Sequence, residues 1–242
     1  MKSFIGIFKA KSKIFLRSKK DLFWIFILPL GLIFLCSFIL DDQGQKISFA
    51  YILPGIMAAA LMHLGFGGAL KFLRFRERNI LKGFRITPFP LRQILSSEIL
   101  LRILMGLVQM GLIILLVVNF FEINLEVNLI LIFLIIFLGL LTFLSLGYML
   151  ICFVKSNEDG KVWAQIIQVI MIFLSGIFFP VDMMPEFIQP VAQIMPLTYL
   201  VDLLREVIVG IPGYFSLNIN LFILITCLIL TSMFTIKFWS WE

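Results

Sequence analysis

LILIFLIIFLGLLTFLSLGYMLICFV, residues 129–154, is apolar almost from end to end and carries no charged side chain. A helix needs roughly 20 apolar residues to cross the hydrocarbon core of a bilayer, which is about 30 Å thick. Five other stretches approach or meet that length, namely residues 22–40, 47–70, 99–121, 162–179 and 214–236. We therefore predict an all-α integral membrane protein with six transmembrane helices.

The composition agrees with a chain that lies mostly in lipid. Hydrophobic residues make up 61% of the 242 residues and charged residues 14%, whereas soluble domains are roughly 45 to 50% apolar. Six spans with short connections leave no room for a sizeable soluble domain, so residues 21–242 are predicted to form one six-helix transmembrane domain. The first span is too long, and lacks a small-residue cleavage site, to be a removable signal peptide.

Residues 1–20 are predicted to form an amphipathic helix in the plane of the membrane interface. Phe4, Ile7 and Phe8 fall near one helical stripe, and Lys9 and Lys13 occupy its flank. This is the pattern of a helix that lies among lipid headgroups. The alternative is a basic flank of the first span that happens to be helical.

The 20 Lys and Arg residues indicate the orientation, because positive charge in short loops is retained in the cytoplasm. Most of them precede the first span or lie between the second and third spans, and only Lys46 and Arg205 fall on the opposite side. We expect a multi-pass protein of the cell membrane with both termini in the cytoplasm. The net charge of +6 then reflects topology and gives no reason to expect a nucleic-acid partner.

Two segments interrupt the apolar pattern. Residues 71–92 contain RFRERNILKGFRITPFPLR, a dense basic run between two spans. Prolines and charges appear again in LSGIFFPVDMMP, residues 174–185, and in MPLTYLVDLLRE, residues 195–206. A seventh span there would bury three charges at about 2.5–3.5 kcal/mol each. We predict instead an outer re-entrant helical hairpin over residues 180–213, between spans five and six, where protein or water covers the irregular backbone.

Few polar side chains lie inside the predicted spans. Glu98 and Arg102 stand four residues apart, in the order that favours an ion pair on one helix. The uncharged candidates for lining a transport pathway are His63, Gln109, Gln165 and Gln168. The alternative for these groups is hydrogen bonding between packed helices.

The polar segments offer no pattern of catalytic or metal-binding residues. His63 is the single histidine, and no Cys or Asp stands near it in sequence to complete a metal site. The polar segments contain neither a carboxylate pair nor a Ser/His/Asp or Cys/His set. We therefore expect no catalytic residue and no metal site in this chain.

The basic segment and the later interrupted segment together resemble the type 2 permease subunits of ATP-binding cassette exporters, including drug and antibiotic efflux systems. The likeness covers nearly the whole chain. Asn79 stands where that family usually has Gly, and Asn also tolerates left-handed backbone. In the basic segment the likeness lies in Arg76, Glu77, Arg78, Leu81, Lys82, Arg85, Thr87 and Pro88.

This resemblance implies that residues 71–92 form a coupling helix that docks on a separate ATPase subunit. It also implies a homodimer, or a heterodimer with a second permease, and an outer hairpin that acts as a gate. The hairpin residues that match are Gly176, Phe179, Pro180, Pro185, Pro196, Tyr199, Asp202 and Arg205. The alternative for the basic segment is binding to anionic lipid headgroups.

ATP and Mg are expected to bind to the partner ATPase, because the 242 residues contain no GxxxxGK[ST] phosphate loop. We therefore expect no cofactor in this chain, and no enzymatic activity of its own. Its expected partners are the ATPase, a second permease and membrane lipid.

The cargo is predicted to be hydrophobic or amphipathic, such as a drug, a peptide antibiotic or a lipid-linked molecule, because the spans are rich in Phe and poor in charge. A polysaccharide or teichoic-acid exporter would share the fold, but 27 Phe beside four Tyr and four Trp argue against an aromatic sugar channel. An ion-gradient-driven secondary transporter would need intramembrane acids or an internal repeat. A non-transporting membrane scaffold is a further alternative.

Overall fold

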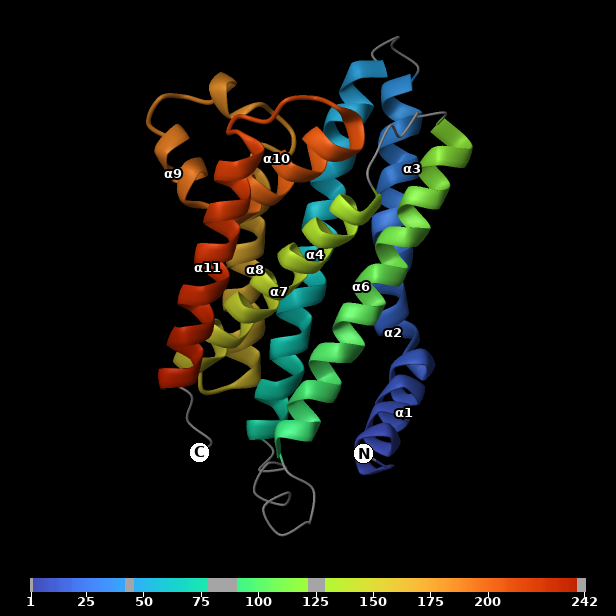
Figure 1. Cartoon of the computed structure of the whole chain (residues 1–242), viewed down its shortest axis with the longest axis vertical. Helices are drawn as coiled ribbons and strands as arrows, with labels where there is room; N and C mark the ends of the chain where they lie inside the picture. The colour runs from blue at the N-terminus through green and yellow to red at the C-terminus, as the bar shows by residue number, and fades with distance from the viewer. Residues whose placement is uncertain (1, 42–45, 78–90, 122–128, 239–242) are drawn as a thin grey trace.

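The computed structural model describes residues 2–41, 46–77, 91–121 and 129–238, and every regular element within these ranges is a helix. The long helices run along the vertical axis of Figure 1, with α4 and α7 in the middle of the bundle. The elements are α1 (Lys2–Arg17), α2 (Lys19–Leu22), the π-helical η1 (Phe23–Ile27), α3 (Leu28–Asp41), α4 (Lys46–Glu77), α6 (Leu91–Phe121), α7 (Leu129–Phe153), α8 (Asn157–Leu174), the 3₁₀ turn η2 (Val181–Met183), α9 (Gln189–Ile194), α10 (Pro196–Val209) and α11 (Leu217–Phe238).

The two ends of the bundle carry different parts of the chain (Figure 1). The lower end holds α1, the last turn of α4, the first turn of α6 and the last turn of α11. The upper end holds α9 and α10, which lie between the end of α8 and the start of α11. The two interrupted segments of the sequence are therefore attached to opposite ends.

Five helical stretches of the described chain are long and apolar enough to cross a membrane, and each overlaps a predicted span. They are Lys19–Ile39, Phe49–Glu77, Gln93–Phe120, Leu129–Phe153 and Leu217–Phe238. The sixth predicted span, residues 162–179, corresponds to α8, which has 18 residues and carries Glu158, Asp159 and Lys161 near its start. The sixth span stays a prediction.

The predicted end of this span at residue 179 is wrong. The α8 helix stops at Leu174, and the N–H of its C-cap Ser175 donates to the carbonyl of Met171. Gly176 then adopts a φ of +73°, the left-handed geometry that commonly ends a helix. Phe179 consequently lies outside the helix, with 69% of its surface exposed.

A helix occupies residues 2–17 of the segment predicted as interfacial. Ser18 ends it and caps α2, because its side chain accepts a hydrogen bond from the Asp21 N–H at 3.3 Å. Phe15 is buried, whereas Ile14 and Leu16 are 69% and 60% exposed. The exposed apolar side chains suit contact with lipid, and the placement of α1 at a membrane surface stays a prediction.

Close contact between α4 and α7 forms the centre of the bundle. The candidate span Phe49–Glu77 lies within α4, and 72% of its most apolar stretch is buried. Gly65 allows the approach, since a Cβ at this position would lie 2.7 Å from the backbone carbon of Phe143. Backbone to backbone contact of this kind is typical of membrane helices that meet at small residues.

We expect Gly65→Ala to lower the free energy of unfolding by about 1–3 kcal/mol, because the added methyl group would push α4 away from α7. Unfolding of the purified protein in micelles of rising dodecyl sulfate content measures this loss. Gly111→Ala in α6 is the matched control, since no described atom lies within 4 Å of its added Cβ. Equal stability of the two variants would contradict the proposed close packing.

Candidate functional site

Most of the predicted coupling residues lie outside the described ranges. These are Arg78, Leu81, Lys82, Arg85, Thr87 and Pro88. Arg76 and Glu77 form the last turn of α4 at the lower end of the bundle. The Arg76 guanidinium donates to the carbonyl of Val154, just after α7, whereas the Glu77 side chain is exposed. Arg76 therefore fastens the end of α4 to the α7–α8 connection, and Glu77 is free to meet a partner.

A partly buried charge cluster lies above this end of α4. We call Lys11, Asp21, Lys71, Glu98 and Arg102 the lower charge cluster. Glu98 is 5% exposed, and one of its oxygens lies 3.3 Å from the Nε of Arg102 while the other lies 3.2 Å from the Nζ of Lys11. Lys71 and Asp21 pair at 2.8 Å. The cluster thus joins α1, α2, α4 and α6.

Main-chain hydrogen bonds complete this cluster. The Lys11 ammonium donates to the carbonyl of Ile94 at 2.8 Å, and the Arg102 guanidinium to that of Gly67 at 3.4 Å. Burial lowers the pKa of Lys11, while the facing Glu98 carboxylate acts in the opposite direction. The ion pairs compensate for the removal of these charges from water, which would otherwise be strongly unfavourable.

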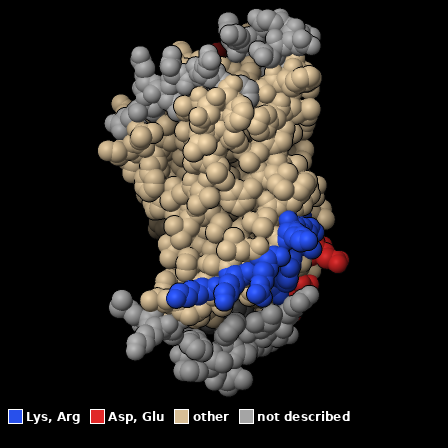
Figure 2. Space-filling model, turned by 90° about the vertical axis from the view of Figure 1, so that its right-hand side faces the viewer, with Lys and Arg blue, Asp and Glu red and all other residues tan. Residues whose placement is uncertain are grey.

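The helix that supplies Lys11 also forms a basic surface. Figure 2 shows Lys and Arg side chains as a band near the lower end of the face that carries α1 and α2. The basic residues of these two helices with described side chains are Lys9, Lys11, Lys13, Arg17, Lys19 and Lys20. The surface above the band is largely uncharged. A charged belt beneath an apolar wall is the arrangement expected at a membrane interface.

A second polar cluster lies at the upper end. We call Tyr51, Gly176, Asp202, Arg205 and Tyr214 the upper polar cluster. The Arg205 guanidinium donates to the Gly176 carbonyl at 2.9 Å and to Asp202 at 3.3 Å. Its Cζ lies 3.7 Å from the centre of the Tyr51 ring, and it donates to the Tyr51 carbonyl at 3.4 Å. One buried side chain thereby connects α10, the end of α8 and α4.

Asp202 extends the same cluster to the start of α11. Its second oxygen accepts hydrogen bonds from the backbone N–H groups of Tyr214 at 2.8 Å and Phe215 at 3.4 Å. Burial raises the pKa of the Asp202 carboxyl and lowers that of the Arg205 guanidinium. The opposite charge of Arg205 and the two N–H donors favour the ionised carboxylate.

The structure brings together three of the predicted gate residues, namely Gly176, Asp202 and Arg205. Tyr199 lies close by, since its ring stacks on Phe215 at 5.4 Å and its hydroxyl donates to the carbonyl of Gln193. The other predicted residues shape the backbone or stand apart: Pro180 precedes η2, Pro185 accepts from the Ile188 N–H, Pro196 begins α10 and Phe179 is exposed.

The predicted pathway residues fall into two groups. The Nδ1 of His63 lies 3.0 Å from the side-chain oxygen of Gln168, and the His63 and Gln165 side chains are exposed. These three residues of α4 and α8 can face a route or a partner. Gln109 is 2% exposed, and its amide donates to the carbonyl of Ile25. Gln109 therefore makes a hydrogen bond between packed helices.

Sequence reasoning missed Tyr51 and Lys11. Each makes its contact with a residue far along the chain, and neither stands in a local pattern that would identify it. The sequence offered one indirect signal for such residues. A charged side chain that is buried, such as Glu98 or Arg205, requires polar or charged partners from elsewhere in the chain.

Comparison with known proteins agrees with the resemblance. Residues 2–209 match the sequence model of the family described as ABC-2 type transporter. Nodulation protein J of Rhizobium leguminosarum bv. viciae is 31% identical over 97 residues, which cover 40% of this chain and 36% of that protein. Nodulation protein J of Rhizobium meliloti (strain 1021) is 33% identical over 72 residues, 30% of this chain and 28% of that protein. The chain thus matches about a third or less of the length of these relatives.

Proposed function

Since the chain belongs to the ABC-2 type transporter family, we propose that it is the membrane subunit of an ATP-driven exporter whose ATP is hydrolysed by a separate ABC ATPase subunit. The observation that carries the proposal is α4, which connects the two clusters. Tyr51 lies near its upper end, and Lys71 and Arg76 lie near its lower end, where the chain continues into the basic segment. A helix of 32 residues spans about 48 Å.

In this proposal α4 carries movement from the ATPase to the outer end. The ATPase grips residues 71–92 and displaces the lower end of α4. Because Arg205 holds the upper part of α4 through Tyr51, a shift or tilt of α4 also moves α10 and the turn at Gly176. Nucleotide-driven closure of the ATPase would in this way open a route toward the outer face.

The proposed orientation places the lower end of the bundle in the cytoplasm. The basic band of α1 and α2 and the end of α4 then meet the cytoplasmic side, as the positive-inside rule requires. The α8 helix serves as the sixth span, with its charged first turns at that side. Residues 175–216 enter and leave at the upper end, and this return supports an outer re-entrant hairpin.

A second permease, identical or homologous, is proposed to cover the face that carries His63, Gln165 and Gln168. The His63 and Gln165 side chains are exposed, and polar side chains in a span are unfavourable in hydrocarbon and usually face a protein interior or an aqueous cavity. Trp24 lies near this face, its ring 6.0 Å from that of His63. We place the cargo route along the junction of the two permeases.

The cargo that best suits this face is hydrophobic or amphipathic. The α8 side chains around Gln165 include the exposed Ile166 and Ile170, so apolar contact dominates and only a few amides could orient a ligand. A polysaccharide is the second candidate, because Trp24 and Trp163 are 44% and 54% exposed and offer flat rings for contact with sugars.

Replacing Glu77 and Arg78 together by alanine tests the coupling. We expect the double variant to lose at least about tenfold of the vanadate-sensitive ATP hydrolysis that the wild-type chain stimulates in its ATPase, since the ATPase no longer follows the permease. Proteoliposomes that contain both subunits provide the measurement. Glu158→Ala together with Lys161→Ala is the matched control, because both are exposed charges in the first turns of α8, outside residues 71–92.

Stimulation that is equal in the double variant and in the α8 control would reject the coupling site. A wild-type chain that stimulates no hydrolysis in any ATPase bound to it would reject the proposed function as a whole.

A further inference from the structure

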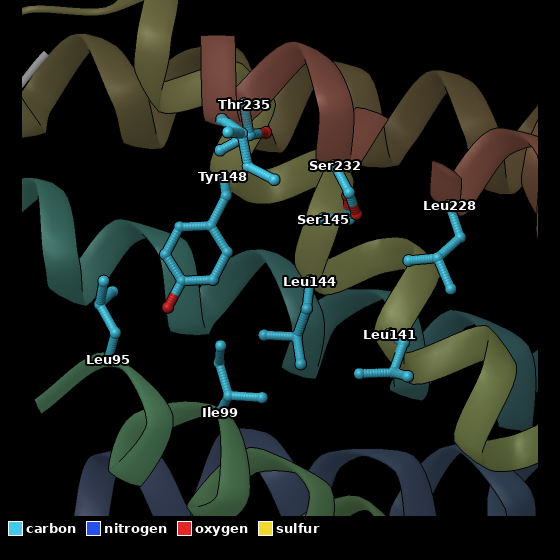
Figure 3. Close-up of a pocket in the computed structure, with 10 residues that line it drawn as sticks. Leu95, Ile99, Leu141, Leu144, Ser145, Tyr148, Leu228, Ser232 and Thr235 are labelled. Carbon is cyan, nitrogen blue, oxygen red and sulfur yellow. The ribbon is translucent and has the colours of Figure 1, made fainter. Parts of the chain in front are cut away.

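A pocket of about 560 Å³ lies between α6, α7 and α11, and no residue of either cluster lines it (Figure 3). Its wall is mostly apolar and includes Leu95 and Ile99 of α6, Leu141 and Leu144 of α7, and Leu228 and Ile236 of α11. The volume is within the usual range for small-molecule sites, which is about 300–1,000 Å³. All three helices belong to candidate membrane spans.

The surroundings of the pocket are apolar, so its ligand would arrive from the bilayer. Ile236, which lines the pocket, is 80% exposed. Its neighbour Met233 is 64% exposed, and Leu100, beside Ile99, is 36% exposed. Since exposed apolar side chains on spanning helices contact lipid tails, the opening faces hydrocarbon.

The serine and threonine hydroxyl groups beside the pocket are paired with one another or with main-chain carbonyls. The Ser145 oxygen lies 2.6 Å from the hydroxyl of Thr231 and 2.9 Å from that of Ser232. Thr231 donates to the carbonyl of Cys227 at 2.7 Å, and Thr235 to that of Thr231 at 2.7 Å. The chain thus supplies partners for these hydroxyl groups, and an occupant without polar atoms leaves none of their protons unpaired.

A positive charge follows the last lining residue of α11, near the lower end of the bundle. Lys237 directly follows Ile236 at the end of α11, its side chain is exposed, and its Nζ lies 5.7 Å from the centre of the Phe238 ring. Lysine at the end of a span attracts anionic headgroups at the membrane surface. The apolar pocket and the cation together form a site with a tail region and a head region.

We propose that this pocket binds one acyl chain of an anionic phospholipid from the surrounding bilayer, with the headgroup beside Lys237. The site goes beyond the proposed export function, and it requires neither an ATPase nor a particular orientation of the chain. A bound lipid fills the space between α6, α7 and α11 and packs these three helices together.

Photolabelling tests the tail region. The purified chain is placed in nanodiscs that contain phosphatidylglycerol with a diazirine near the end of one acyl chain, and labelled peptides are identified by mass spectrometry. We expect Leu141→Trp and Ile99→Trp to reduce labelling of the lining residues about fivefold, because the indole fills the pocket. Leu104→Trp is the matched control, since Leu104 is 40% exposed on α6 and does not line the pocket.

The head region is tested with the same diazirine on phosphatidylcholine. Labelling of the wild-type pocket is expected to be about fivefold stronger with phosphatidylglycerol than with phosphatidylcholine. Lys237→Gln is expected to remove most of this preference for the anionic lipid. Helical content by circular dichroism confirms that each variant is folded. Pocket variants that label like Leu104→Trp, or a preference that survives Lys237→Gln, would overturn the proposal.

Discussion

Replacing Glu98 by leucine is expected to lower the free energy of unfolding by about 3–5 kcal/mol, because Arg102 and Lys11 then remain as buried cations without a carboxylate between them. Both partners are well shielded from water, with side-chain exposures of 3% for Arg102 and 16% for Lys11. Unfolding in mixed micelles measures the loss. We also expect α1 to become susceptible to proteolysis, since Lys11 ties α1 to α6 through Glu98 and the Ile94 carbonyl.

A combined variant separates charge burial from packing. Glu98→Leu together with Lys11→Met and Arg102→Met removes all three charges, and we expect it to recover most of the lost stability, because apolar residues of similar size can replace a buried ion network. Glu158→Leu is the surface control, since Glu158 is an exposed acid of α8. If Glu98→Leu proved as stable as Glu158→Leu, the lower charge cluster would not contribute to the free energy of unfolding.

The sequence predicted those parts of the fold that depend on length and local spacing. Five of the six apolar stretches appear as candidate spans, because a long uncharged run has few stable alternatives to a helix in lipid. The Glu98–Arg102 pair was likewise predictable, since residues four apart share one helix face. The third member of that cluster, Lys11, was not, because helix periodicity does not reveal which distant helix packs against α6.

At the upper end, too, contacts within one helix were predictable from the sequence and contacts between distant helices were not. Asp202 and Arg205 are three residues apart, so their association follows from the helix of α10. Tyr51 contributes a ring and a carbonyl from another helix, and only the packing of α10 against α4 brings it there. The end of α8 was mispredicted because hydrophobicity continues through Phe178 and Phe179, although Gly176 gave a conformational signal for an earlier stop.

Replacing Arg205 by methionine is expected to destabilise the protein by about 3–5 kcal/mol, because Asp202, which is 3% exposed, keeps two N–H donors but loses its counter-charge. The Gly176 carbonyl also loses its hydrogen bond from Arg205. The same unfolding titration measures the loss. The proposed function further predicts that, in proteoliposomes with the ATPase, ATP hydrolysis continues while cargo movement falls, because that proposal has α4 carry movement to α10.

Two further variants show why this role requires arginine. Arg205→Lys keeps the charge but cannot bond to Asp202 and Gly176 while it lies flat against the Tyr51 ring, so we expect an intermediate loss. Tyr51→Leu keeps the Tyr51 carbonyl but removes the ring contact and the hydrogen bond from the Tyr51 hydroxyl to the Gly176 carbonyl, and it should cost about 0.5–2 kcal/mol. The order of stability is then wild type, Tyr51→Leu, Arg205→Lys and Arg205→Met. A lysine variant as stable as wild type would show that charge alone matters, and that the planar guanidinium does not connect α4 to the hairpin.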